Sequence, residues 1–189
     1  MFTKASWKKI STCITSALTL VMLVGGLLSI ASPVHAQSNA LVTCSGTESI
    51  TWSPNLTNTT QDYAVTLADN FPLCAISNPL SLTSMMASAS FERNYSCLTI
   101  LGSGSGVQTF TWANGTTSEY TFNAVITIVD GSFEVEQTGT ITGGTATAYI
   151  GQEAIGSVIL SPPLGEDIAD ACATNGLSSA SGPYLFTIL

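Results

Sequence analysis

Two groups of carboxylates are the residues whose types and spacing could do chemistry in this sequence. Glu134 and Glu136 lie two positions apart, so both project from one face of an extended strand, and Glu119 falls on a neighbouring strand. Carboxylates roughly 6–7 Å apart could serve as the acid and the base of an inverting glycosidase. Solvated charges on a sheet surface explain the same pattern, and we favour that explanation, so no catalytic residue is predicted.

The second group is Glu166, Asp167 and Asp170, which lie close to Cys172. Oxygen ligands of this kind suit calcium. Their spacing differs from that of a known calcium loop, and acidic residues are also favoured at the N-terminus of a helix. We therefore predict no metal ligand, and the sequence leaves calcium binding by these three residues open.

The first 36 residues have the pattern of a signal peptide. An apolar run extends from residue 17 to residue 31, small residues follow it up to Ala36, and three bases precede it, namely Lys4, Lys8 and Lys9. The apolar run is short for a membrane span. We expect cleavage after Ala36, export to the extracellular space or cell envelope, and a single disulfide-bonded all-β domain over residues 37–189.

The composition of the expected mature chain excludes several chemistries. His35 and all three lysines lie in the signal peptide, which leaves Arg93 against twelve carboxylates and a formal charge of −11. Without histidine there is no Ser-His-Asp triad and no His-ligated zinc, and without lysine there is no Schiff base. Nucleic acid and anionic membranes are poor partners for so acidic a chain. The glycines of residues 102–106 match no cofactor-binding loop and predict a flexible linker, so no cofactor is expected.

Four cysteines remain after cleavage, and an even number in an exported chain indicates two disulfides with three possible connectivities. We prefer Cys44–Cys74 because a hairpin around residues 54–60 brings the two close together. The apolar alternation of the two strands misses this pairing by one residue, so a bulge near Gly46 or Pro72 must absorb the difference. The second pair, Cys97–Cys172, follows by elimination.

The chain around these residues is organised by a predicted four-stranded meander over residues 107–150. Its turn signals are Asn114-Gly115, Asp130-Gly131 and Gly143-Gly144. A one-residue slip would invert the faces of a strand, so the apolar positions fix the registers. The first hairpin needs a three-residue loop over residues 114–116. The predicted pairs are Phe110 with Tyr120, Phe122 with Gly139, Ile126 with Val135, and Gln137 with Ile150.

The opposite face of this meander is predicted to be flat and rich in threonine. The same registers gather on it Thr121, Thr138, Thr140, Thr147, Tyr149 and Glu136. Threonine suits a solvated sheet face because it is β-branched and polar, which is the simpler explanation. A platform that binds a glycan or another polymer is the functional alternative.

The rest of the chain adds short strands at residues 41–52, 62–68, 95–101, 157–160 and 184–189. Residues 70–82 should be irregular, residues 81–91 fit a strand or a loose helical turn, and residues 166–173 suit a short helix. Eight or nine short strands at this spacing are typical of all-β folds. The favoured fold is an antiparallel β-sandwich, immunoglobulin-like or related, and a small β-barrel is the alternative.

Several short motifs give the chain a family resemblance: Thr43-Cys-Ser-Gly-Thr47, Trp52-Ser-Pro-Asn-Leu-Thr57, Ser96-Cys-Leu98, Trp112-Ala-Asn-Gly-Thr-Thr-Ser118 and Gln137-Thr-Gly-Thr-Ile-Thr142. With these motifs the chain resembles a group of uncharacterised small secreted proteins with four cysteines that is common in actinobacteria. The resemblance implies a secreted all-β domain and no catalytic residue. Residues 70–93 depart from the pattern of the group.

Three functions follow as hypotheses. The first is a secreted, non-enzymatic module that binds an extracellular glycan or cell-wall polymer through the threonine-rich face. The second is a secreted effector, such as a protease inhibitor or a toxin-like protein, that contacts a protein partner through residues 70–91. A glycosidase that uses Glu134 and Glu136 is the third. The sequence leaves the oligomeric state open.

Overall fold

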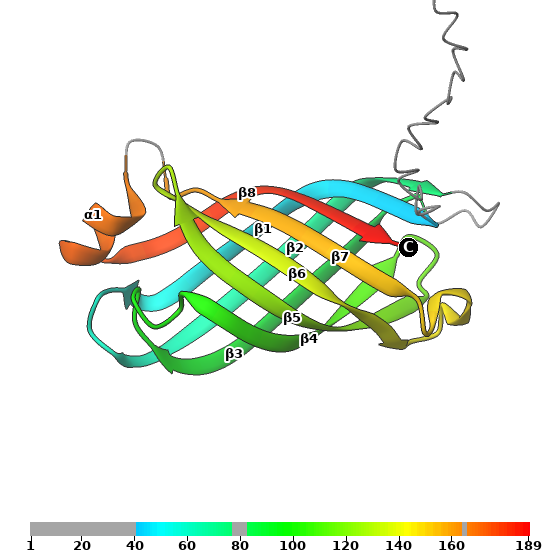
Figure 1. Cartoon of the computed structure of the whole chain (residues 1–189), viewed down its shortest axis with the longest axis horizontal. Helices are drawn as coiled ribbons and strands as arrows, with labels where there is room; N and C mark the ends of the chain where they lie inside the picture. Colours follow the sequence, from blue (N-terminus) through cyan, green and yellow to red (C-terminus); the bar gives the residue numbers. More distant parts are fainter. Residues whose placement is uncertain (1–40, 77–82, 164–165) are drawn as a thin grey trace, which may run out of the picture. The chain divides into compact units, whose positions relative to one another are not determined.

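A computed structural model describes residues 41–76, 83–163 and 166–189, which form a closed antiparallel barrel of eight strands in sequence order (Figure 1). The strands are β1 (Val42–Leu56), β2 (Gln61–Ile76), β3 (Met85–Tyr95), β4 (Gly102–Trp112), β5 (Thr117–Val129), β6 (Ser132–Gly143), β7 (Glu153–Leu160) and β8 (Leu177–Ile188). A 3₁₀ helix, η1 (Thr147–Tyr149), precedes β7, and α1 (Ile168–Ala173) precedes β8. The chain divides into two units, Met1–Ala36 and Gln37–Leu189. The first lies outside the described residues, so the signal peptide stays a prediction.

The all-β prediction is confirmed, and the architecture is the barrel rather than the favoured sandwich. Each strand pairs with its neighbours in sequence, and β8 returns to pair with β1, for example at Ile50↔Ala180. Strands of up to 16 residues, joined by hairpins, twist enough to close on themselves. Alternate residues point inward and bury an aromatic core that includes Phe71, Phe110, Tyr120 and Phe186.

The first three strands of the predicted meander are present, and one of the two registers between them is correct. The β5–β6 register is as predicted, with Phe122↔Gly139 and Ile126↔Val135. The β4–β5 register differs by two residues, because Phe110 pairs with Ser118 and not with Tyr120. The turn lies earlier than expected, since Asn114 Oδ1 accepts a hydrogen bond from the Thr116 backbone N–H at 2.9 Å. An even shift keeps every side chain on its predicted face.

The fourth predicted strand, over residues 145–150, is wrong. The Ala146 backbone N–H donates to Thr117 O at 2.8 Å, which draws the chain away from β6 after Gly144. Residues 147–149 form η1, whose Tyr149 is buried with its ring centroid 5.7 Å from that of Trp112. Burial of this tyrosine at the end of the barrel replaces the expected hairpin, and β7 starts four residues after Tyr149, at Glu153.

Two further predictions between β3 and β4 are corrected. Residues 95–101 are mostly a turn rather than a strand, while residues 102–106 form the first half of β4 rather than a linker. Hydrogen bonding to β5, from Gly102↔Ile126 onward, overrides the low strand propensity of glycine. Of the ambiguous segment at residues 81–91, residues 85–91 belong to β3. Of the segment predicted to be irregular, residues 70–76 belong to β2 and residues 77–82 lie outside the described residues.

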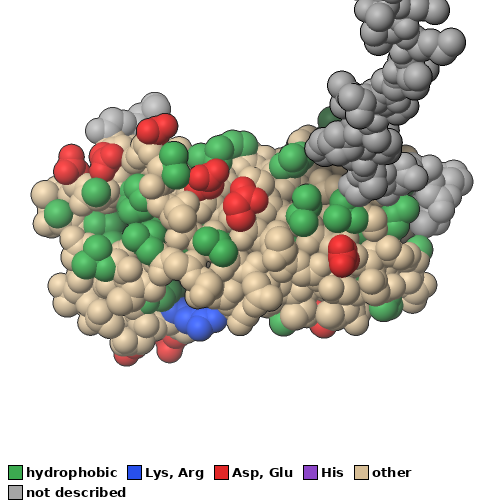
Figure 2. Space-filling model, in the orientation of Figure 1, with side chains coloured by type: hydrophobic (Ala, Val, Ile, Leu, Met, Phe, Trp, Pro, Cys, Tyr) green, Lys and Arg blue, Asp and Glu red, His purple; other side chains and the backbone are tan. Residues whose placement is uncertain are grey.

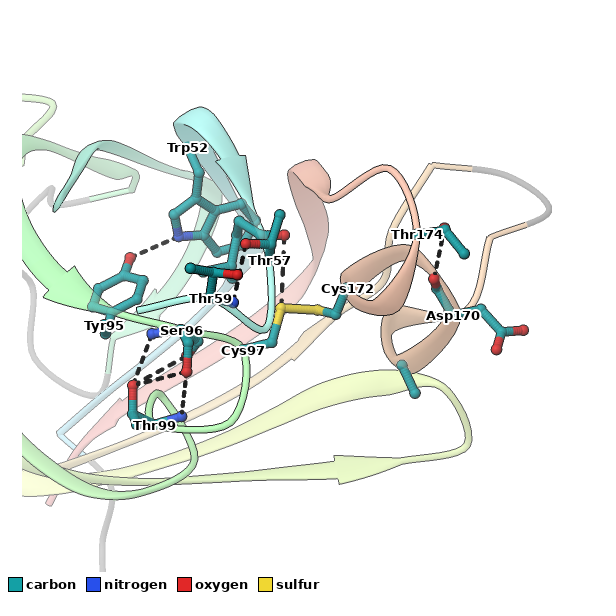
Figure 3. Close-up of a disulfide and its surroundings, with 12 residues drawn as sticks. Trp52, Thr57, Thr59, Tyr95, Ser96, Cys97, Thr99, Asp170, Cys172 and Thr174 are labelled. Carbon is teal, nitrogen blue, oxygen red and sulfur yellow. Dashed lines mark hydrogen bonds between the residues drawn. A yellow bond between two sulfur atoms is a disulfide. The ribbon is translucent and has the colours of Figure 1, made fainter. Parts of the chain in front are cut away.

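The described residues contain two disulfides, and these join the pairs preferred from the sequence. Cys44–Cys74 links β1 to β2 beside a bulge at Gly46. Cys97–Cys172 ties the β3–β4 turn to α1 (Figure 3). Around this second bridge, Trp52 Nε1 donates to Tyr95 Oη at 2.7 Å, so the end of β3 is fixed to β1. Among the described residues, no helix is long and apolar enough to cross a membrane.

Candidate functional site

β3 and β4 close the barrel wall at one end of their length and leave it open over the rest. Within the described residues these strands pair only at Met85↔Trp112 and Met86↔Thr111. Strand β3 continues alongside β2 to Tyr95, and β4 begins alongside β5 at Gly102. The facing edges over residues 87–95 and 102–110 therefore have no partner strand. We call this opening the β3–β4 slot.

Glycines on β4 keep the slot open. Residues of β4 with even numbers point inward, and three of them in succession are Gly102, Gly104 and Gly106. A Cβ added at Gly104 would meet no heavy atom within 4 Å. A Cβ at Gly106 would lie 2.7 Å from Phe122 Cζ, so a glycine there lets the phenyl ring of Phe122 lie over β4. Because these three inward positions carry no side chain, they leave space on the inner side of the barrel wall.

Two of the cavities lie along β3 and β4, and the first of these lies in the slot. The first has a volume of about 270 Å³ and is lined by two phenyl rings, aliphatic groups, two amides and one guanidinium: Leu67, Ala89, Phe91, Arg93, Ser105, Gly106, Val107, Gln108, Phe122 and Gln137. The second, of about 720 Å³, is lined mainly by exposed side chains on the outside of β2, β3 and β4, together with Asp69 and Ala87. The lining of the first cavity, with apolar walls and a few polar groups, is typical of small-molecule sites.

A buried polar network lies under the first cavity. Gln108 Nε2 donates a hydrogen bond to Asp69 Oδ2, and Tyr184 Oη donates to Gln137 Oε1 at 2.7 Å. Glu48 is the cross-strand partner of Asp69, and both carboxyl side chains are buried. Within the described part of the chain, Asp69 Oδ1 has no hydrogen-bond partner although it is buried. The network fixes which amide atoms of the two glutamines remain free to face the slot.

Burial also controls the charge of this network. Desolvation raises the pKa of Glu48 to about 7. Desolvation and the nearby charge of Glu48 raise the pKa of Asp69 to about 8, although the hydrogen bond from Gln108 opposes the rise. Ionisation of both of two adjacent buried carboxyls has a high free-energy cost, because the two negative charges repel each other. The pair therefore keeps at least one proton at neutral pH.

The threonine-rich face predicted from the sequence is present in reduced form. Thr121 pairs with Thr140, Thr138 pairs with Asn123, and all three threonine side chains point outward. Thr147 and Tyr149 do not belong to this face, because they lie in η1 and Tyr149 is only 4% exposed. Figure 2 shows one face of the molecule, on which the backbone and side chains that are neither charged nor hydrophobic predominate, and hydrophobic side chains are scattered.

Both predicted carboxylate groups lie away from the slot, and Glu166, Asp167 and Asp170 line one cavity of about 190 Å³ beside α1. Glu136 is exposed on the outside of the barrel, where Ser157 Oγ donates to its Oε1 at 2.6 Å. Asp167 caps α1, because its Oδ1 accepts from the Ala169 backbone N–H at 2.8 Å. The described residues contain no group of three or more side chains placed to hold a metal ion. The glycosidase and the protein effector stay hypotheses, and calcium binding stays open. Part of the effector's contact segment, residues 77–82, lies outside the described residues.

Sequence reasoning missed the slot residues, although a signal for them exists. Glu48, Asp69, Gln108 and Gln137 occupy inward positions in strands whose other inward residues are mostly apolar. A polar residue at such a position must be satisfied by a partner inside the fold. Four of them on four strands indicate a shared polar interior, which the separate strand patterns do not reveal.

Comparison of the chain with family models, curated proteins and solved structures found no match. The resemblance to small secreted actinobacterial proteins therefore stays a prediction. Function must be argued from the slot and from the outer surface.

Proposed function

We propose that this protein is an exported, non-enzymatic binding protein that takes a small extracellular ligand into the β3–β4 slot. The observation that carries the proposal is the loss of strand pairing after Met86↔Thr111, in a barrel whose other neighbouring strands pair along much of their length. The two disulfides are compatible with an oxidising compartment.

Unpaired strand edges in the barrel wall lower the stability of the fold unless a ligand covers them. Backbone N–H and C=O groups on both sides of the slot have lost their partners, and proteins usually pair or cover such strand edges. The slot also leaves Phe91 40% exposed on an inward-pointing position. A ligand would bury this ring and that of Phe122 while its polar atoms meet the amides of Gln108 and Gln137. Binding therefore buries aromatic rings and gives hydrogen-bond partners to amide groups that are solvated in the free barrel.

A blocking substitution tests this proposal. Gly104→Gln places a side chain in the open space on the inner side of β4, whereas Ser103→Gln adds the same side chain to the exposed position before it. We expect Gly104→Gln to weaken ligand binding at least 10-fold and Ser103→Gln to leave it within 2-fold. Ligand-observed NMR against a set of mono- and disaccharides, amino acids, and aromatic and aliphatic acids gives the measurement.

Both variants should unfold at the same denaturant concentration as the parent, which separates blocking from misfolding. Binding that is equally strong in Gly104→Gln would place the ligand elsewhere on the molecule. The proposal would also be abandoned if no compound in the set binds the parent protein.

The threonine-rich face supports a second candidate, the binding of an extracellular polysaccharide. Thr121 Oγ1 lies 2.9 Å from Thr142 Oγ1, so neighbouring strands present hydroxyls in a row on the outside of β5 and β6. We expect Thr140→Lys to reduce cosedimentation with the polymer that binds, among cellulose, chitin and peptidoglycan, by at least 5-fold. Thr127→Lys, on the outer surface further along β5, is the matched control and should have no effect. Equal losses in both variants would indicate a charge effect and not a site.

A further inference from the structure

We infer that the ligand of the β3–β4 slot is a small aromatic carboxylate, held by its carboxylate at Arg93 and by its ring between Phe91 and Phe122. This inference rests on the proposed function and gives it a ligand class. It follows from the first cavity alone, whose residues supply one cation, two phenyl rings and two amides with defined free atoms.

The carboxylate is assigned from Arg93. Arg93 is the single Lys or Arg side chain among the described residues, which also contain all twelve carboxylates of the chain. Its guanidinium lies at the slot, with Cζ 6.0 Å from the centroid of the Phe91 ring, and both residues line the first cavity. A guanidinium binds a carboxylate through two parallel hydrogen bonds. The surrounding negative charge disfavours a more highly charged anion, so a monoanion fits best.

The ring is assigned from the two phenylalanines. Phe91 belongs to β3, and Phe122 reaches the slot from β5 across Gly106. The Phe122 ring is held by Tyr120, with centroids 5.1 Å apart in a stacked arrangement. Aromatic pairs in offset or edge-to-face geometry are favoured beyond the area that they bury. The cavity volume of about 270 Å³ lies slightly below the usual range of ligand pockets, which suits a molecule with one ring.

The two amides add a preference for a hydroxyl on the ring. Gln137 Oε1 accepts from Tyr184, which leaves the Gln137 amide N–H groups to donate to a ligand. Gln108 Nε2 donates to Asp69, which leaves Gln108 Oε1 to accept. A hydroxyl group both accepts and donates one hydrogen bond, so it complements this pair of free atoms. A hydroxybenzoate carries the three features that the cavity recognises.

Titration with four probes tests the inference. The probes are 4-hydroxybenzoate, its neutral analogue 4-hydroxybenzamide, benzoate and hexanoate, and the side-chain amide signals of Gln108 and Gln137 in ¹⁵N NMR report on the slot. We expect 4-hydroxybenzoate to bind most tightly and to shift both amide signals. Arg93→Gln should weaken it about 10- to 100-fold, as expected for loss of a charge-assisted bidentate contact, and should change 4-hydroxybenzamide binding less than 3-fold.

The failures of the two proposals can be told apart. If 4-hydroxybenzamide or hexanoate binds the parent protein as tightly as 4-hydroxybenzoate, the inference is overturned. The same holds if Arg93→Gln leaves 4-hydroxybenzoate binding unchanged. If these four probes fail but a saccharide or an amino acid shifts the two amide signals, the inference falls and the slot remains a binding site. If no compound shifts them, both proposals fall.

Discussion

Replacing Cys97 and Cys172 by alanine should lower the free energy of unfolding by about 4.5 kcal/mol, as expected when a cross-link between residues 75 positions apart is lost. The cross-link restricts the unfolded chain, and this restriction grows with the length of the closed loop. Both cysteines are buried in the folded barrel, where the bridge holds the β3–β4 turn against α1. Urea unfolding of the parent protein and the double variant measures the difference.

The other disulfide provides the matched control. Cys44 and Cys74 are 30 residues apart, and the same relation gives a loss of about 3.6 kcal/mol when they are replaced by alanine. The first double variant should therefore be the less stable of the two. A loss below about 1 kcal/mol, or the reverse order, would contradict this account. Either result would indicate that the unfolded chain is already compact without the Cys97–Cys172 bridge.

The free energy of unfolding should fall as the pH rises from 5 to 7, by about 3 kcal/mol if the folded protein holds one extra proton over this range. Burial raises the pKa of Glu48 from 4.5 to about 7 and that of Asp69 from 3.8 to about 8. Between the ordinary and the raised values, the folded state binds more protons than the unfolded chain. Stability is then highest below the unfolded pKa values and is lost as the pH rises through the folded ones.

A double variant isolates this effect. Glu48→Gln with Asp69→Asn keeps the size of both side chains and removes their titration, so its stability should change little over the same pH range. The difference in pH dependence between parent and variant, measured by urea unfolding at several pH values, gives the contribution of the pair. A parent protein whose stability rises with pH in parallel with the variant would show that the two carboxyls ionise normally in the folded state.

The sequence predicts much of the sheet because the relevant signals are local. Asp130-Gly131 sets a tight turn, and the apolar alternation on either side of it fixes the β5–β6 register. The preferred pair Cys44–Cys74 also follows from one hairpin and one bulge. These features need no knowledge of any distant part of the chain.

The errors arise where distant contacts decide the structure. Gly104 lies in a strand because β5 pairs with it, although its own neighbours resemble a linker. Tyr149 is drawn inward by Trp112, so a pattern that fits a strand becomes a 3₁₀ helix. The slot exists because β3 and β4 do not pair over most of their length. No pattern in the sequence predicts that two neighbouring strands stay unpaired. The buried polar network under the slot can be predicted only when Glu48 and Asp69 are considered together.

Amide hydrogen exchange along β3 and β4, measured by NMR, tests most directly whether the barrel wall is open. Half of the backbone N–H groups of residues 87–95 and 102–110 point toward the slot, and these should exchange rapidly, whereas the N–H groups that bond to β2 and β5 should be protected. Addition of a ligand that occupies the slot should slow the rapid set. Uniform protection of both strands in the free protein, equal to that of β5 and β6, would show that β3 and β4 pair throughout and that the slot does not exist.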